Sequence, residues 1–348
     1  MSPYTLTILL SSLGLGTTLT FMTSHWLLAW MGLEINTLAI LPLMAQHHHP
    51  RAVEATTKYF LAQAAAAATI LFASTINAWT TGEWNILCLS NSMAVTLTTM
   101  ALALKVGLAP LHFWMPPVMQ GLDLTTGLIM ATWQKLAPLA LMIQIIPLTS
   151  PQLVTTLALL SVIMGGWGGL NQTQLRKIMA YSSIAHLGWM IAIMQFKPQL
   201  TIMVLFTYII MTAATFLTFK LMHTTKINTL ATTWPKMPII TATAALTLLS
   251  LGGLPPLTGF MPKWLILQEL TAQDLPLTAT IMALSALLSL YFYLRLCYSM
   301  TLTISPNTNN SSAPWRLQNT QNTTLLALFT MSALMLLPLT PLAQALTN

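Results

Sequence analysis

Eleven apolar segments follow one another along this chain, each close to the ~20 residues that an α-helix needs to cross a bilayer. Only 5% of the 348 residues are charged, whereas soluble domains carry about 25%. The sequence therefore predicts an all-α polytopic membrane protein with about eleven transmembrane helices. The expected segments are roughly 3–23, 25–45, 56–79, 92–120, 125–146, 150–172, 175–195, 199–222, 238–271, 276–303 and 323–346.

The fourth segment is interrupted by the motif KVGLAPLHFWMPP at residues 105–117. A lysine in hydrocarbon costs about 2.5–3.5 kcal/mol on insertion scales. Proline removes a backbone donor and clashes with the preceding helical turn. The carbonyl groups that such a break frees are tolerated at membrane depth only against protein or a water-filled cavity. This motif therefore predicts a discontinuous helix near residues 107–112 with an internal polar site beside it.

The ninth segment repeats the motif. GLAPLHFWMP at 107–116 aligns with GLPPLTGFMP at 253–262, an offset of 253 − 107 = 146. Trp114 then corresponds to Phe260, and a second lysine, Lys263, follows its break instead of preceding it. Five helices separate the copies, and an odd separation turns the second copy upside down, as in transporters built from inverted repeats. We expect a second discontinuous helix near 252–259, a first five-helix repeat over 1–146, an inverted second repeat over 150–303, and a loop and C-terminal helix over 304–348.

Four charged residues are expected deep within the apolar segments: Glu34, Lys105, Lys135 and Lys263. Intramembrane ionisable groups usually face the bundle interior, pair with one another and mark ion paths. The simpler alternative is a structural Glu–Lys pair with two lysines that extend to the membrane surface. That alternative fails for Lys105 and Lys135, which lie too centrally. We favour the interpretation that the four groups carry ions.

The chemistry that these residue types predict is proton relay. Burial disfavours an ammonium group, and a nearby carboxylate restores it. Movement of Glu34 relative to Lys105 would therefore switch the lysine between holding and releasing a proton, and we expect the two side chains to meet within a few ångströms or through one water. His112 and His186 are secondary candidates, because histidine titrates near neutral pH. A histidine satisfied by a neighbouring hydroxyl group explains them equally well.

The basic residues predict an orientation, because Lys and Arg accumulate in cytoplasmic or matrix loops. On the expected topology, Lys197 alone lies on the side opposite the N-terminus, which places the N-terminus on the cytoplasmic or matrix side. The other basic loop residues share the N-terminal side: Arg51, Lys58, Arg176, Lys177, Lys220, Lys226, Lys236 and Arg316. Their scatter along the chain argues against nucleic-acid binding, and two cysteines predict no disulfide framework.

The motif at 105–116 resembles the discontinuous-helix signature of the antiporter-like membrane subunits of respiratory complex I, the proton-pumping NADH:ubiquinone oxidoreductase. GLPPLTGFMPK at 253–263 is similar to the second signature, and GLEIN around Glu34 is similar to the helix with the family's key glutamate. The resemblance covers essentially the whole chain. The 23 methionines and the absence of the first helices of bacterial members fit a mitochondrially encoded animal member.

The resemblance implies a role for each charged residue. Glu34 and Lys105 would form the glutamate–lysine pair, Lys135 the central bridging lysine, and Lys263 the terminal lysine. His112 and His186 would join a hydrated central axis. The implied function is that of a proton-translocating core subunit in the mitochondrial inner membrane, with the N-terminus in the matrix and the C-terminus in the intermembrane space.

The same resemblance implies that FMN, the iron–sulfur clusters and ubiquinone bind to other subunits, with no cofactor or metal site in this chain. The implied partners are neighbouring antiporter-like subunits, small membrane subunits and lipids. Two alternatives remain: an autonomous cation/proton antiporter of related fold, and a purely structural membrane subunit. The small number of buried carboxylates argues against a sodium site.

Overall fold

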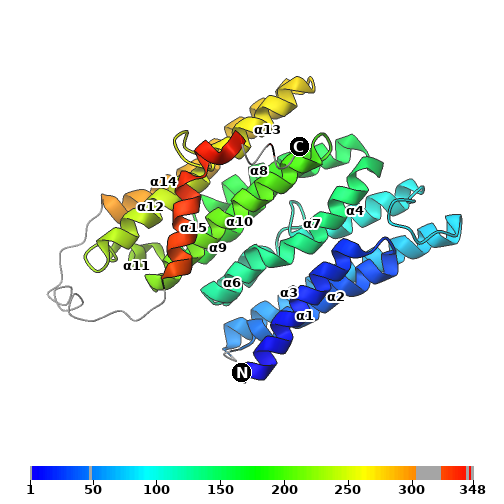
Figure 1. Cartoon of the computed structure of the whole chain (residues 1–348), viewed down its shortest axis with the longest axis horizontal. Helices are drawn as coiled ribbons and strands as arrows, with labels where there is room; N and C mark the ends of the chain where they lie inside the picture. Colours follow the sequence, from blue (N-terminus) through cyan, green and yellow to red (C-terminus); the bar gives the residue numbers. More distant parts are fainter. Residues whose placement is uncertain (1, 47–48, 303–322, 342–344, 346–348) are drawn as a thin grey trace. The chain divides into compact units, whose positions relative to one another are not determined.

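The computed structural model describes residues 2–46, 49–302, 323–341 and 345. These residues form α-helices joined by short turns (Figure 1), and within them there is no β-strand, only two isolated bridges between residues outside the helices. Among the described residues, eight helical stretches are long and apolar enough to cross a membrane, and three shorter apolar helices accompany them. The prediction of an all-α polytopic membrane protein is confirmed.

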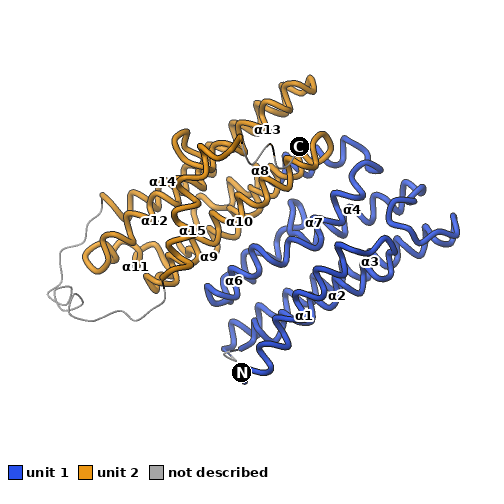
Figure 2. Tube along the Cα trace, viewed as in Figure 1, with its two compact units in different colours: residues 1–161 blue, residues 162–348 orange. Residues whose placement is uncertain are grey.

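The helices gather into two compact units, residues 1–161 and 162–348 (Figure 2). The boundary lies within α8 (Pro151–Gly169). Unit 1 contains α1 (Pro3–Met22), α2 (Trp26–Met44), α3 (Pro50–Thr81), α4 (Ser92–Val106), α5 (Met115–Gly121), α6 (Leu124–Ala131), α7 (Trp133–Ile145) and the short 3-10 helix η1 (Ile146–Leu148). Unit 2 contains α9 (Leu175–Met194), α10 (Pro198–Leu221), α11 (Ile227–Ala231), α12 (Pro238–Gly252), α13 (Phe260–Ala272), α14 (Pro276–Thr301), α15 (Thr324–Met335) and the 3-10 helix η4 (Leu337–Leu339).

Small residues and helix pairs organise unit 1. The helices α1 and α2 make the most extensive contact. They approach closely at Gly16 and Gly32, where there is no room for a larger side chain: a Cβ on Gly32 would overlap the side chain of Thr20. Small residues allow such close approach between membrane helices. The helix α3 packs against α2, α4 and α5, while α7 packs against α4 and α1. The helices α2, α4 and α7 carry Glu34, Lys105 and Lys135, respectively.

One helix forms the core of unit 2. The helix α9 is 89% buried along its apolar window, whereas α1 in unit 1 is 22% buried. The helices α10, α13 and α14 all contact α9, and α12 packs between α10 and α14. A helix that is apolar all round is expected in such an interior position. This core holds His186 and supports the broken segment α12–α13.

Both predicted helix breaks are confirmed. The helix α4 ends at Val106 and α5 begins at Met115, while α12 ends at Gly252 and α13 begins at Phe260. Gly107 and Gly253 end the first halves in the left-handed region, at φ values of 87° and 81°. Glycine adopts this region without the steric cost that a Cβ adds. The inverted relation between the two repeats stays a prediction.

Two expected boundaries were wrong, and one expected helix has a break inside it. The helix α3 begins at Pro50 instead of residue 56, because proline fits the first helical position and the ring of His49 accepts from the Arg51 N–H at 3.2 Å. The segment 125–146 is interrupted at Thr132, whose hydroxyl donates to the Leu128 carbonyl at 2.7 Å; such bonds compete with regular helix geometry. The helix α15 ends at Met335, shortly before a proline. The loop expected at 305–322 lies outside the described residues.

Candidate functional site

At the first break, donors reach three of the end carbonyls of α4, those of Ala103, Leu104 and Lys105. The N–H groups of Gly107 and Leu108 both donate to the carbonyl of Ala103, at 2.9 Å each. The indole N–H of Trp114 donates to the Leu104 carbonyl at 3.0 Å. The side-chain amide of Gln63, on α3, donates to the Lys105 carbonyl at 3.3 Å. Neutral groups therefore satisfy these three carbonyls.

The ammonium group of Lys105 lies beside this break but, unlike the end carbonyls of α4, is not hydrogen-bonded by neighbouring groups of the described chain. The residue is 6% exposed, and its Nζ has no hydrogen-bond partner among the described residues. The Glu34 carboxylate, on α2, lies within electrostatic range of Lys105 and also of Tyr59. Its Oε2 is likewise buried without a hydrogen-bond partner in the described part of the chain. Within the described residues the pair forms no direct hydrogen bond, and the expected approach within a few ångströms or through one water stays a prediction.

One small cavity is lined by both Lys105 and Lys135. It offers about 20 Å³ to the centres of water molecules, and one buried water needs roughly 10–15 Å³ on this measure. Lys135 is 2% exposed. The two lysines line the cavity together with amide, phenol and apolar groups, among them Asn36, Tyr59, Gln63, Trp114 and Gln134. The structure thus brings lysines from α4 and α7 to one space that can hold water.

Sequence reasoning missed the uncharged polar lining of this cavity. Gln63, Asn36 and Gln134 are amides within apolar segments, and Tyr59 is 2% exposed. Buried amides need partners, so their presence in apolar helices was a usable signal. The break at Thr132, three residues before Lys135, left no comparable signal, because threonine is common throughout this chain.

The second break places its lysine differently. The N–H groups of Gly253 and Leu254 donate to the Leu249 carbonyl, at 3.2 and 3.4 Å. Lys263 Nζ, half-buried on the first turn of α13, donates to the Gly252 carbonyl at 2.8 Å. A Cβ on Gly253 would lie 2.9 Å from Lys263 Nζ. Lys263 therefore caps the carboxyl end of α12, where a cation is favoured by the helix dipole.

The two histidines lie in separate surroundings. His112 is 3% exposed within the turn of the first break, and its ring stacks on Phe113 with centroids 4.6 Å apart. His186 is 8% exposed on α9, with its ring centroid 5.5 Å from that of Tyr208. Glu34, His112 and His186 are not among the described residues that line the cavity. Within the described ranges, no cluster of three His, Cys, Asp or Glu side chains could hold a metal ion.

Comparisons with known proteins agree on one family. The pattern of the NADH:quinone oxidoreductase/Mrp antiporter transmembrane family matches residues 23–289, and that of the NADH dehydrogenase subunit 2 C-terminus matches 290–344. The chain is 73% identical to NADH-ubiquinone oxidoreductase chain 2 of Carassius auratus and 67% identical to that of Danio rerio, in each case over all of both chains.

Solved structures share the fold. A chain of respiratory complex I from Thermus thermophilus superposes with a TM-score of 0.81 at 27% identity, over 97% of this chain and 80% of that one. A chain of an archaeal membrane-bound sulfane sulfur reductase gives a TM-score of 0.85 at 19% identity, over 97% and 73%. This second likeness is one of fold alone.

Proposed function

Because this chain belongs to the NADH:quinone oxidoreductase/Mrp antiporter family, among its NADH-ubiquinone oxidoreductase chain 2 members, we propose that its intramembrane lysines carry protons. The chain is a proton-translocating core membrane subunit of complex I and a multi-pass protein of the mitochondrial inner membrane. Other membrane subunits of the complex are its partners. FMN, the iron–sulfur clusters and ubiquinone are assigned to other subunits.

The relay in unit 1 runs from Lys105 to Lys135 through water. Lys105 Nζ gives a proton to a water oxygen while that water gives one to the neutral amine of Lys135, so one proton moves and the water is regenerated. Glu34 controls the step, because its charge stabilises the ammonium form of Lys105. The observation that carries this proposal is the single cavity that both lysines line, with room for water.

Unit 2 contributes Lys263 as the terminal lysine of the relay. Two histidines serve as secondary proton carriers: His112 at the break in unit 1, and His186 in the core of unit 2. The two histidine assignments are supported by the burial of His112 and His186, because buried ionisable groups in membrane proteins are rare and usually functional. Lys263, half-buried beside the second break, is assigned on its place in the repeated motif. An autonomous antiporter is the second candidate, but the relatives that match the full length of this chain are named as an oxidoreductase chain.

The experiment that tests the relay is Lys135→Met in the intact complex. Methionine keeps the length of the side chain and removes its proton-carrying group. We expect proton pumping and coupled quinone reduction to fall together, while electron entry from NADH to an artificial acceptor stays unchanged. Lys236→Met is the matched control, because Lys236 is exposed in the turn before α12. Normal pumping in assembled Lys135→Met complex would support the purely structural role instead.

We also propose that the N-terminus lies in the matrix and the C-terminus in the intermembrane space. Cys88 is exposed in the turn after α3, whereas Cys297 is buried. On this orientation, membrane-impermeant maleimide added to the outside of intact inner membranes should label Cys88. The hydrogen bond to Glu83 raises the pKa of the Cys88 thiol, so labelling should accelerate as the pH rises. Labelling only after the inner membrane is opened would reverse the orientation.

A further inference from the structure

One end of α3 extends beyond the hydrocarbon. The helix has 32 residues, so at about 1.5 Å per residue it is longer by roughly 18 Å than a ~30 Å hydrocarbon core. Its charged residues, Arg51, Glu54 and Lys58, all lie in its first nine positions, and residues 59–81 carry no charge. The uncharged stretch is long enough to cross the membrane alone. The charged end of α3 therefore lies at the depth of the lipid headgroups.

A pocket opens at this charged end. It has a volume of about 200 Å³ and is lined by Arg51, Glu54, Ala55, Lys58, Pro117, Gln120 and Gly121. Its walls are the first turns of α3 and the last turn of α5. The two helices are locked together there, because a Cβ on Gly121 would lie 2.6 Å from the Cβ of Ala55 and would also collide with the Arg51 carbonyl. The pocket is thus a fixed cleft between two helices.

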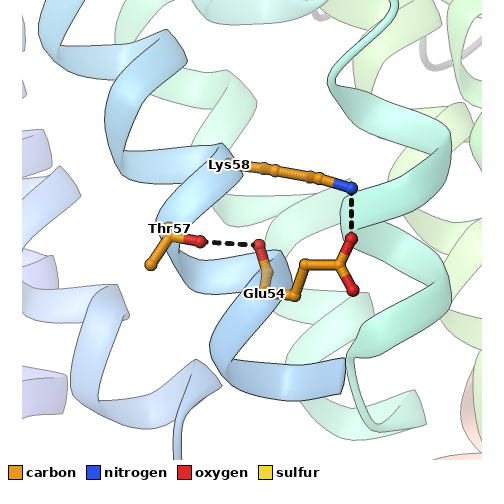
Figure 3. A network of polar contacts seen from close by, with 3 residues as sticks. All are labelled: Glu54, Thr57 and Lys58. Carbon is orange, nitrogen blue, oxygen red and sulfur yellow. Dashed lines mark hydrogen bonds and ion pairs between the residues drawn. The ribbon is translucent and has the colours of Figure 1, made fainter. Parts of the chain in front are cut away.

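The charges around the pocket do not cancel. Glu54 forms an ion pair with Lys58 one helical turn away, and its backbone carbonyl accepts from the Thr57 hydroxyl at 3.0 Å (Figure 3). The guanidinium group of Arg51 acts on the Glu54 carboxylate only at longer range, because Arg51 forms no direct ion pair with the described residues. Two cations against one carboxylate leave a net charge of +1 at the mouth of the pocket.

We propose that this pocket binds the phosphodiester headgroup of an anionic phospholipid, with Arg51 as the main contact and Lys58 beside it. A guanidinium group matches the oxygens of a phosphodiester with two parallel hydrogen bonds. The side-chain amide of Gln120, in the opposite wall, supplies a neutral donor. Basic pockets between membrane helices at headgroup depth are suited to anionic lipids. The acyl chains of the same lipid would follow the apolar surface of α3, where Leu61 is 67% exposed and Phe72 is 57% exposed.

The experiment uses the intact complex in nanodiscs that contain photoreactive phosphatidylglycerol or matched photoreactive phosphatidylcholine. We expect the anionic lipid to label residues 50–58 and 117–121, and the zwitterionic lipid to label them far less. Arg51→Gln should lower anionic labelling about five-fold, the effect of one basic residue near a membrane surface. Glu54→Gln should raise it, and a misfolded variant could not produce such a gain. Lys236→Gln removes one positive charge away from the pocket and should leave labelling unchanged.

Three further results would overturn the proposal. Equal labelling by the two lipids would show that charge does not select the occupant. Cross-linking of this pocket to a neighbouring subunit, with labelling by neither lipid, would assign it to a protein contact. Inorganic phosphate distinguishes the two sources of a phosphate group. Labelling that survives millimolar phosphate supports the lipid, and labelling that phosphate abolishes would make the pocket a site for free phosphate.

Discussion

The two broken helices have similar backbone geometry but differ in the donors that bond their end carbonyls. In both, a glycine in the left-handed region and the residue after it donate to one carbonyl in the last turn. In the first break, Trp114 and Gln63 cap the Leu104 and Lys105 carbonyls, and the Lys105 ammonium makes no hydrogen bond to the described residues. In the second, Phe260 replaces Trp114 and has no polar hydrogen to donate, and Lys263 caps the Gly252 carbonyl.

This difference assigns different work to the two lysines. Lys105 is left to interact with Glu34 and with the cavity, because neutral donors hold the helix end. Lys263 holds the end of α12 through its hydrogen bond to the Gly252 carbonyl. Moving its side chain would therefore leave that carbonyl without this donor at membrane depth. Lys263 therefore combines a structural role with the relay proposed for it, whereas Lys105 has the relay alone. The position of the lysine, before or after the break, decides whether its charge holds the fold or faces a cavity.

The largest effect is expected where the two breaks differ most in packing. Gly259 corresponds to Phe113, by the offset of 146. A Cβ on Gly259 would overlap the Ser250 carbonyl, whereas Phe113 is 73% exposed. We expect Gly259→Ala to destabilise by about 3 kcal/mol, the upper range of overpacking, and to deplete the assembled complex. Phe113→Ala should change stability by no more than about 0.5 kcal/mol, as surface substitutions usually do.

The yield of intact complex on a native gel, with its thermal inactivation midpoint, measures both variants. Similar losses for Gly259→Ala and Phe113→Ala would mean that the two breaks are packed alike.

The next effect separates capping from charge at Lys263. Lys263→Met removes a hydrogen bond from a charged donor, worth about 1.5–3 kcal/mol, and should reduce assembly. Lys263→Gln keeps a neutral donor for the Gly252 carbonyl, so it should restore much of the assembly. Because glutamine carries no proton, pumping in the assembled Lys263→Gln complex should still fall. Equal assembly of the two variants would remove the capping role.

The smallest effect is expected from a variant that tests whether the Lys105 ammonium stays away from the end carbonyls of α4. Trp114→Phe gives the first break the phenylalanine that the second has at the corresponding position. It removes a neutral hydrogen bond worth about 1 kcal/mol. The Leu104 carbonyl then lacks its donor, and the ammonium of Lys105 is drawn toward the helix end. We expect nearly normal assembly with slower pumping. Trp167→Phe is the control, since Trp167 is 68% exposed. A Trp114→Phe complex with unchanged pumping would show that Lys105 does not depend on this cap.

Much of this architecture could be predicted because hydrophobic length and proline position are local properties. The apolar segments and both breaks follow from runs of residues and from Gly107, Pro110 and Gly253. The caps could not be predicted, because Gln63 reaches Lys105 across 42 positions and Lys263 reaches back 11 positions across a turn. Such contacts depend on how helices pack. The meeting of Lys105 and Lys135 at one cavity depends on the same packing.

The most direct test of the account is Lys105→Met, measured as the ratio of protons pumped to NADH oxidised. Breaking a buried pair costs roughly 3–5 kcal/mol, so the ratio is taken only from complex that has assembled. We predict a lower ratio and coupled quinone reduction slowed by at least about ten-fold, the cost of 1.4 kcal/mol in the barrier. Electron entry to an artificial acceptor should be unchanged. A normal ratio at a normal rate would contradict the claim that Lys105 carries the proton.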